Sequence, residues 1–124
     1  MTMTQSEART AWEAYASIWK LTGPQAKRAA CAQYLDDGCV YTDPITQRKG
    51  WDALVEYMVE FHQQVPGGHF VTTDFKAHNE RSVATWNMVG GDGAVLGTGI
   101  SYGEYSGDGK VRTMTGFFET PHQP

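Results

Sequence analysis

The residue best suited to acid–base chemistry is Asp43, which follows the short strand-forming run "CVYT" and precedes Pro44. Proline restricts the residue before it to extended backbone, so the Asp43 side chain would be fixed at the strand end. A carboxylate held there against apolar walls could act as a general base. An aspartate before proline also closes local turns by accepting backbone hydrogen bonds. The sequence leaves both roles open.

Two other side chains could act with Asp43. Tyr15 shares a helical face with Trp12 and Trp19. Its phenol could donate a hydrogen bond to an oxygen at which charge develops, or could be a satisfied core group. His69 opens a predicted strand and could face Asp43 as an acid, a base or an orienting partner. Asp43, Tyr15 and His69 are therefore the candidate catalytic residues.

Length and composition narrow the classes of function. The 124 residues predict one domain, 1–124, and the formal net charge of -4 disfavours nucleic acid as a partner. No apolar run is long enough to span a membrane, so no membrane association is predicted. Cys31 and Cys39 form neither a disulfide framework nor a zinc motif, which is typical of a cytoplasmic protein. No metal is predicted, and the absence of a phosphate-binding glycine motif predicts no cofactor.

The front of the chain is predicted to contain three helices. Thr4 and Glu7 form a potential capping box for the first helix, and Thr22 with Gln25 a potential cap for a second that runs to about residue 35. "LDDG" is expected to break that second helix before the strand at residues 39–42. A third helix is predicted from Gly50 up to the terminator "VPGG", whereas "QRK" before it is expected to be a loop tip.

After residue 68 the apolar pattern changes from a helical period to a period of two. The runs "HFVTTDFKAH", "SVATWNMV", "AVLGTGISYGEY" and "KVRTMTGFFE" are separated by the turn signals "NER", "GGDG" and "SGDG". This pattern predicts an antiparallel four-strand meander. The predicted fold is therefore α+β, with three N-terminal helices packed on a strongly curved, mostly antiparallel sheet that forms a cone with an apolar pocket.

The strand alternation and the helical faces predict which residues line this pocket. Glycines inside the strands suit a bent sheet or one that leaves space beside it. An apolar stripe of this kind is also compatible with plain core packing. The predicted ligand is a small apolar molecule, and the predicted lining is Trp12, Val55, Met58, Phe61, Trp86, Ser101, Gly103, Met114, Gly116 and Phe118.

The segment "YLDDGCVYTDPITQRKGWDALVEYM" and the final hairpin "SGDGKVRTMTGFFE" carry a family resemblance. The first has an acidic pair, a strand, Asp-Pro, a variable loop and a helix that begins at glycine. Residues 9–118 thus resemble the nuclear transport factor 2-like superfamily, whose cone-shaped domains include ketosteroid isomerase and the SnoaL-like polyketide cyclases. The superfamily also contains ligand binders and dimerisation modules, so the fold does not fix the function.

The resemblance implies roles for particular residues. Asp43 matches the general base of the ketosteroid isomerases, and Tyr15 resembles their enolate donor. Ser101 occupies the position of their second acid, so steroid isomerase activity is not expected. The implied function is a cofactor-independent isomerase, cyclase or lyase that acts on a small apolar carbonyl or hydroxylated ring compound. The alternative is a non-catalytic ligand-binding or dimerisation module, and either would form a homodimer through the outer face of the sheet.

Overall fold

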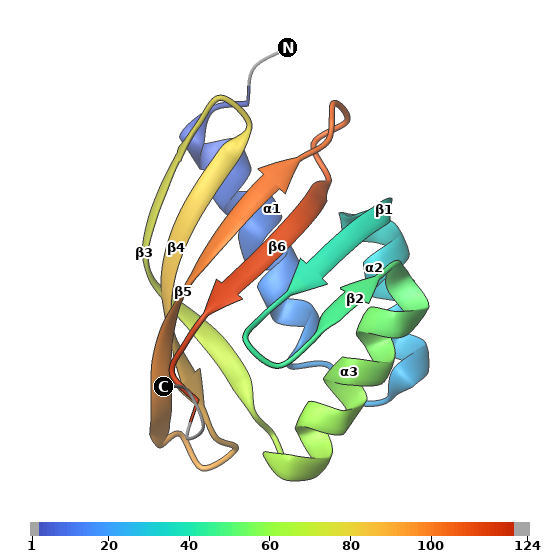
Figure 1. The fold of residues 1–124 in the computed structure, drawn as a ribbon, viewed down its shortest axis with the longest axis vertical. Coiled ribbons are helices and arrows are strands. Elements are labelled where there is room, and N and C mark those ends of the chain that lie inside the picture. The colour runs from blue at the N-terminus through green and yellow to red at the C-terminus, as the bar shows by residue number, and fades with distance from the viewer. Residues whose placement is uncertain (1–2, 121–124) are drawn as a thin grey trace.

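The protein combines three helices with one six-stranded sheet in a computed structural model that describes residues 3–120 (Figure 1). The α+β prediction is confirmed. The helices are α1 (Gln5–Ile18), α2 (Pro24–Tyr34) and α3 (Trp51–Gln64), and the strands are β1 (Leu35–Thr42), β2 (Gln47–Lys49), β3 (His69–His78), β4 (Arg81–Val89), β5 (Val95–Tyr105) and β6 (Val111–Phe117).

The sheet is open and runs in the order β2-β1-β6-β5-β4-β3. Strands β3 to β6 form the predicted antiparallel meander, and β1 joins it by pairing in parallel with β6. This parallel pairing places the end of β1, where Asp43 follows, next to the end of β6. The helices lie behind the sheet in Figure 1, with α1 crossing it and α3 beside β1 and β2.

The start of the chain folds as its capping signals predict, but α2 does not. The Thr4 hydroxyl accepts from the Glu7 amide at 3.0 Å, and the Glu7 carboxylate accepts from the Thr4 amide at 2.8 Å. The predicted cap of α2 by Thr22 is wrong, because Gly23 occupies the N-cap position and makes no side-chain cap bond. The φ angle of Gly23 is 87°, a left-handed conformation that favours glycine.

Two predictions between α2 and α3 are also wrong. The "LDDG" segment is the first half of β1 rather than a break, because buried Leu35 already pairs with Val111. The register with β6 shifts between Leu35 and Val40, which accommodates the extra residues as an irregularity. The "QRK" segment is the short strand β2, which pairs with β1 and was expected to be a loop.

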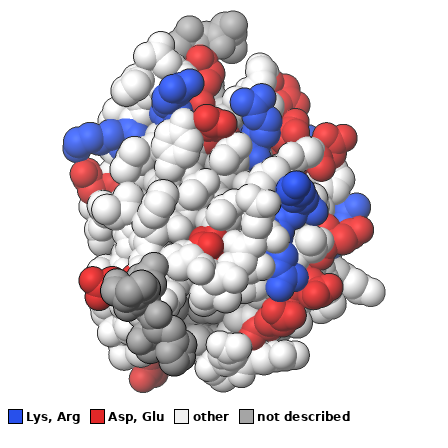
Figure 2. Space-filling view, in the orientation of Figure 1, with Lys and Arg blue, Asp and Glu red and all other residues white. Residues whose placement is uncertain are grey.

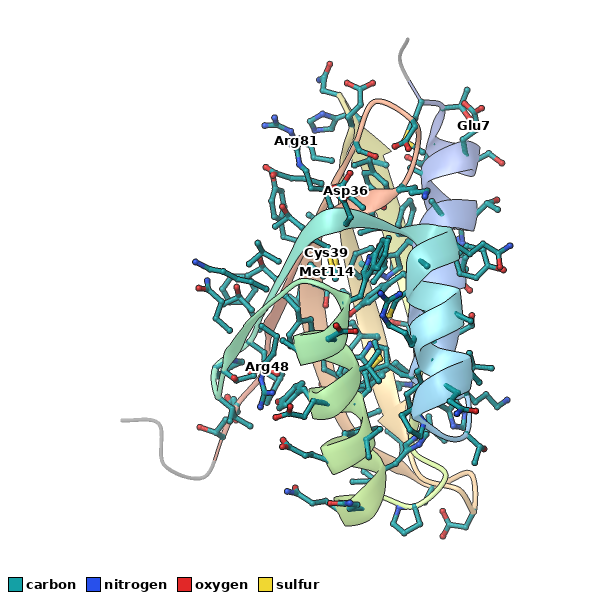
Figure 3. All side chains as sticks on the ribbon, turned by 90° about the vertical axis from the view of Figure 1, so that its right-hand side faces the viewer. Glu7, Asp36, Cys39, Arg48, Arg81 and Met114 are labelled. Carbon is teal, nitrogen blue, oxygen red and sulfur yellow. The ribbon has the colours of Figure 1, made fainter. Side chains whose placement is uncertain are left out.

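The core lies between the helices and the inner face of the sheet, where Figure 3 shows Cys39 and Met114. Among residues 3–120 two charged side chains are buried, Asp43 and Lys27, and Lys27 is fully buried. The Lys27 ammonium donates to the carbonyls of Ile18 and Trp19, both at 3.2 Å, and to that of Leu21. Ile18 and Trp19 end α1 and Leu21 lies just beyond it, so Lys27 binds carbonyls at the C-terminus of this helix and opposes its dipole.

The outer face of the sheet is only partly apolar. Ile100 and Phe117 pair across β5 and β6 and are 47% and 58% exposed. Figure 2 shows largely uncharged surface over the middle of these strands, with charged side chains toward the top and the right-hand margin. The homodimer contact expected on this face stays a prediction. Within residues 3–120 none of the helices has the length and apolar character that a membrane span needs.

Candidate functional site

Asp43 performs the turn-closing role predicted for its side chain and also binds two tyrosines, whereas its role as a base stays a prediction. Its Oδ1 accepts hydrogen bonds from the backbone amides of Ile45 and Thr46 at 2.8 and 3.0 Å, which is the turn-closing role. Its Oδ2 accepts from the hydroxyls of Tyr41 and Tyr57, both at 2.7 Å. The side chain is buried, with 8% of the residue exposed. A carboxylate has about four lone-pair sites, and here all four are occupied.

Three elements bring these groups together. Tyr41 lies two residues before Asp43, so the alternation of β1 directs it to the inner face of the sheet. Tyr57 comes from α3, fourteen residues farther along the chain. The turn itself is closed by the Asp43 amide, which donates to the Thr46 carbonyl at 2.9 Å. Asp43 therefore ties the end of β1, the turn before β2 and the helix α3 to one another.

The two tyrosines are held in their neutral form. Burial raises the pKa of Tyr41 well above its ordinary value, with a further contribution from the charge of Asp43. Burial is also the main reason why the pKa of Tyr57 is raised, and its hydrogen bond to Asp43 acts in the same direction. A neutral phenol is a donor, so both hydroxyls keep donating to the carboxylate.

Arg48 of β2 covers the outer side of this group. Its guanidinium lies 5.1 Å from the centroid of the Tyr57 ring and forms ion pairs with Glu56 at 3.3 Å and Glu60 at 3.4 Å. Figure 3 shows Arg48 reaching toward α3. The side chain is 20% exposed, so these contacts fix the position of the Tyr57 ring more than they add stability. Within residues 3–120 no cationic side chain forms an ion pair with Asp43 itself.

A small cavity of about 50 Å³ lies on the inner side of the sheet next to Asp43. Most of its wall consists of aromatic rings from α1 and the strands. Gly116 also borders it, and a methyl group at that position would lie 3.8 Å from the Asp43 Cβ atom. Asp43 itself is not among the lining residues, and its link to the cavity is Tyr41, which borders the cavity and donates to the carboxylate. The lining residues are Trp12, Tyr15, Ala16, Trp19, Tyr41, Phe70, Thr72, Trp86, Ser101, Gly116 and Phe118.

Tyr15 supplies the cavity with a polar group. Its hydroxyl oxygen accepts a hydrogen bond from the Trp19 indole N–H at 3.1 Å. Among the hydrogen bonds of residues 3–120, none uses the Tyr15 hydroxyl as a donor. Burial raises the pKa of Tyr15, so the phenol stays protonated. Its proton is therefore able to serve a hydrogen-bond acceptor inside the cavity.

Ser101 holds the ring that closes the other end of the cavity. The Trp86 indole N–H donates to the Ser101 hydroxyl at 2.9 Å. The ring crosses the neighbouring strand at Gly99, where an added Cβ would lie 2.3 Å from Trp86 Cζ2. Gly103 is covered in the same way, at 2.7 Å, by the Trp12 ring. Gly99 and Gly103 of β5 therefore make room for tryptophan rings rather than for open space.

The structure separates the predicted lining into two sets. Trp12, Trp86, Ser101, Gly116 and Phe118 border the cavity. The other five lie outside it for identifiable packing reasons. Val55, Met58 and Met114 are buried in the core, and Gly103 is covered by Trp12. The ring of Phe61 stacks on that of Phe70 with a centroid distance of 5.3 Å, and it is Phe70 that borders the cavity.

His69 begins β3, and its Nδ1 is 3.1 Å from the Gly67 carbonyl. Among the hydrogen bonds of residues 3–120, none joins His69 to Asp43. The role of His69 as a partner of Asp43 stays a prediction. Within residues 3–120 no three His, Cys, Asp or Glu side chains are arranged to hold a metal ion.

The sequence interpretation missed Tyr41, Tyr57 and Trp19 as parts of the site. Tyr41 could have been found, since residues two apart in a strand share a face and Tyr41 is two before Asp43. Trp19 shares the helical face of Tyr15. Tyr57 had no comparable signal, because its approach to Asp43 depends on how α3 packs against β1.

Gly99 is predicted to determine the position of Trp86. In Gly99→Ala the new methyl would overlap the indole, so the Trp86–Ser101 hydrogen bond should be lost. The free energy of unfolding should then fall by about 1–3 kcal/mol. Chemical denaturation followed by tryptophan fluorescence measures both effects. Gly97→Ala on the same strand is the control, since its methyl would meet only Met88 at 3.9 Å. Equal stability of the two variants would contradict this role for Gly99.

Comparisons with known proteins agree with this architecture. Three solved structures align over most of both chains. The "putative isomerase of the SnoaL-like family" from Agrobacterium tumefaciens has a TM-score of 0.85 and 20% identity and covers 93% of this chain and 99% of its own. A SnoaL-like protein of unknown function from Burkholderia thailandensis has a TM-score of 0.73 and 15% identity, with 95% and 99% covered.

The third structure is a hypothetical protein with a ketosteroid isomerase-like fold from Catenulispora acidiphila, in complex with trimethylamine. It has a TM-score of 0.71 and 14% identity, with 94% of this chain and 88% of that chain covered. At these identities the likeness shows the fold alone. A comparison with curated proteins gives no match. The model of the SnoaL-like domain matches residues 9–120, and the chain therefore belongs to the SnoaL-like family.

Proposed function

We propose that this protein binds a small, compact, largely apolar molecule in the aromatic cavity. The observation that carries the proposal is Tyr15, which lines this cavity and whose hydroxyl donates none of the hydrogen bonds found among residues 3–120. Ligand sites typically combine apolar walls with a few polar groups that fix the orientation of the ligand. Tyr15 is such a group, and Trp19 fixes it by donating to its oxygen.

The size of the cavity limits the ligand. A volume of about 50 Å³ equals roughly three to five water sites, so a steroid-sized molecule would need the walls to move. The trimethylamine in the Catenulispora structure is a compact molecule of the size that we propose here. A single small ring or a branched group of similar bulk is the appropriate ligand class.

Catalysis is the second candidate, and the position of Asp43 beside the cavity favours it. In an isomerase or lyase reaction the Asp43 carboxylate would take a proton from a carbon next to a carbonyl. The C–H bond breaks, the electron pair moves to the carbonyl oxygen, and Tyr15 donates to the resulting enolate. Since all four lone-pair sites of Asp43 are occupied, Tyr41 would first have to release Oδ2. The Agrobacterium protein named a "putative isomerase of the SnoaL-like family" supports this class of reaction by analogy only.

Binding is tested by NMR with cyclohexanone and phenol as probes. The signals measured are the ring-current shifts of the ligand protons and the shift of the Trp19 indole N–H resonance. The wild-type protein should bind both, and Tyr15→Phe should weaken binding about threefold to tenfold through loss of one hydrogen bond. Tyr34→Phe, a half-buried tyrosine outside the cavity, should bind as the wild type does. Failure of both probes to shift the Trp19 resonance would contradict the proposed binding site.

Catalysis is tested by exchange of the α-protons of cyclohexanone in D₂O. If Asp43 is a base, the wild-type protein should accelerate the exchange, and Asp43→Asn should abolish the acceleration while the ligand still binds. Asp108→Asn, on the exposed hairpin between β5 and β6, is the matched control. Wild-type exchange at the uncatalysed rate, with cyclohexanone bound, would remove the base assignment and leave a binding protein.

A further inference from the structure

The hydrogen-bond partners of Asp43 do not balance its charge. Buried charges in proteins are normally paired with an opposite charge. All four donors to Asp43 are neutral: two phenols and two backbone amides. Within residues 3–120 no Lys, Arg or His lies within ion-pair distance of this carboxylate. Its negative charge is therefore stabilised by neutral hydrogen-bond donors and is not balanced by a positive charge.

The surroundings do not neutralise this charge either. Arg48 is the cation on the far side of Tyr57, and it is already paired with both Glu56 and Glu60. Together with Asp43 these make three carboxylates to one guanidinium. The influence of the Asp43 charge reaches the cavity, since it contributes to raising the pKa values of Tyr15 and Tyr41, and both side chains line the cavity. The Asp43 charge therefore acts on two of the side chains that border the cavity.

The walls of the cavity favour a cation for a second reason. Neighbouring rings stand close to perpendicular: Trp19 and Phe70 at 80°, Phe70 and Trp86 at 81°, and Trp86 and Phe118 at 67°. Rings that meet at such angles form the sides of a box instead of a flat stack. The negative face of an aromatic ring attracts a cation, and aromatic boxes are used to recognise quaternary ammonium groups.

The hydrogen bond from Tyr41 to Asp43 polarises the Tyr41 ring and strengthens the preference of the cavity for a cation. Its hydroxyl donates to the Asp43 carboxylate at 2.7 Å, and a phenol that donates to an anion becomes richer in electrons. The Tyr41 oxygen and ring therefore offer more negative charge to the cavity than an unpaired tyrosine would. No residue that borders the cavity carries a positive charge that would oppose a cation.

We propose that the ligand of this cavity is a small alkylammonium cation, held by the aromatic rings and by the field of Asp43. This inference rests on the proposed binding function and specifies the chemistry of the group that is bound. The small volume, about 50 Å³, restricts the cationic group to one of the size of a trimethylammonium or a slightly larger head group. A neutral molecule of the same shape should gain less, because it uses neither the ring faces nor the carboxylate.

The test compares molecules of equal shape and different charge. The probes are choline and its neutral isostere 3,3-dimethyl-1-butanol, with equal ionic strength kept by sodium chloride, and binding is measured by NMR from the upfield shift of the methyl protons. We expect choline to bind at least about tenfold more tightly. Equal binding of the two probes, or tighter binding of the alcohol, would overturn the cation proposal and leave the binding function in place. Failure of both probes to bind would overturn the cation proposal as well.

Two variants separate the contributions. Trp86→Leu removes one wall and should weaken choline binding roughly twofold to thirtyfold, with Trp51→Leu, which lies outside the cavity against Arg28, as the matched control. Asp43→Asn should reduce the preference for choline over the alcohol, because it removes the charge and keeps the shape. An unchanged preference in a folded Asp43→Asn protein would contradict the part assigned to the carboxylate. If that variant does not fold, the Trp86→Leu result decides, and unweakened binding there contradicts the aromatic box.

Discussion

The four hydrogen bonds of Asp43 are the interaction on which the site depends. Oδ1 closes the turn that returns the chain from β1 to β2, and Oδ2 holds a tyrosine from the sheet and a tyrosine from α3. Removing such an acceptor leaves several donors unsatisfied in a buried place, which is costly. The same carboxylate thus fixes the local fold and holds two tyrosines, of which Tyr41 borders the cavity.

The shape of the cavity depends on the positions at which tryptophan rings can pack against β5. Gly99 and Gly103 lack side chains, so the rings of Trp86 and Trp12 can lie directly against β5. Ser101, between them on the same face, anchors the Trp86 indole through a hydrogen bond. The hydroxyl of this serine serves to position a wall of the cavity. The result is a small, aromatic and nearly uncharged space beside one buried anion.

Much of this arrangement follows from local sequence signals. The period of the apolar residues gave the helices and the meander, and the Asp-Pro step placed Asp43 at a strand end. The features that could not be predicted depend on contacts between residues far apart in the sequence. β2 is too short and polar to carry a strand signal, and it exists because its backbone pairs with β1. Tyr57 and the true cavity lining depend on how α3 and α1 pack. Strand order, which sets β1 beside β6, is likewise not visible in local patterns.

Asp43 accepts hydrogen bonds from two phenol hydroxyls, that of buried Tyr41 and that of half-buried Tyr57. Proton NMR of the tyrosine hydroxyls in the unliganded protein tests this arrangement directly. Two slowly exchanging hydroxyl resonances shifted downfield are expected. One should disappear in Tyr41→Phe and the other in Tyr57→Phe, and both should move in Asp43→Asn. Hydroxyl protons that exchange rapidly with water and give no such resonances in the wild-type protein would contradict the account.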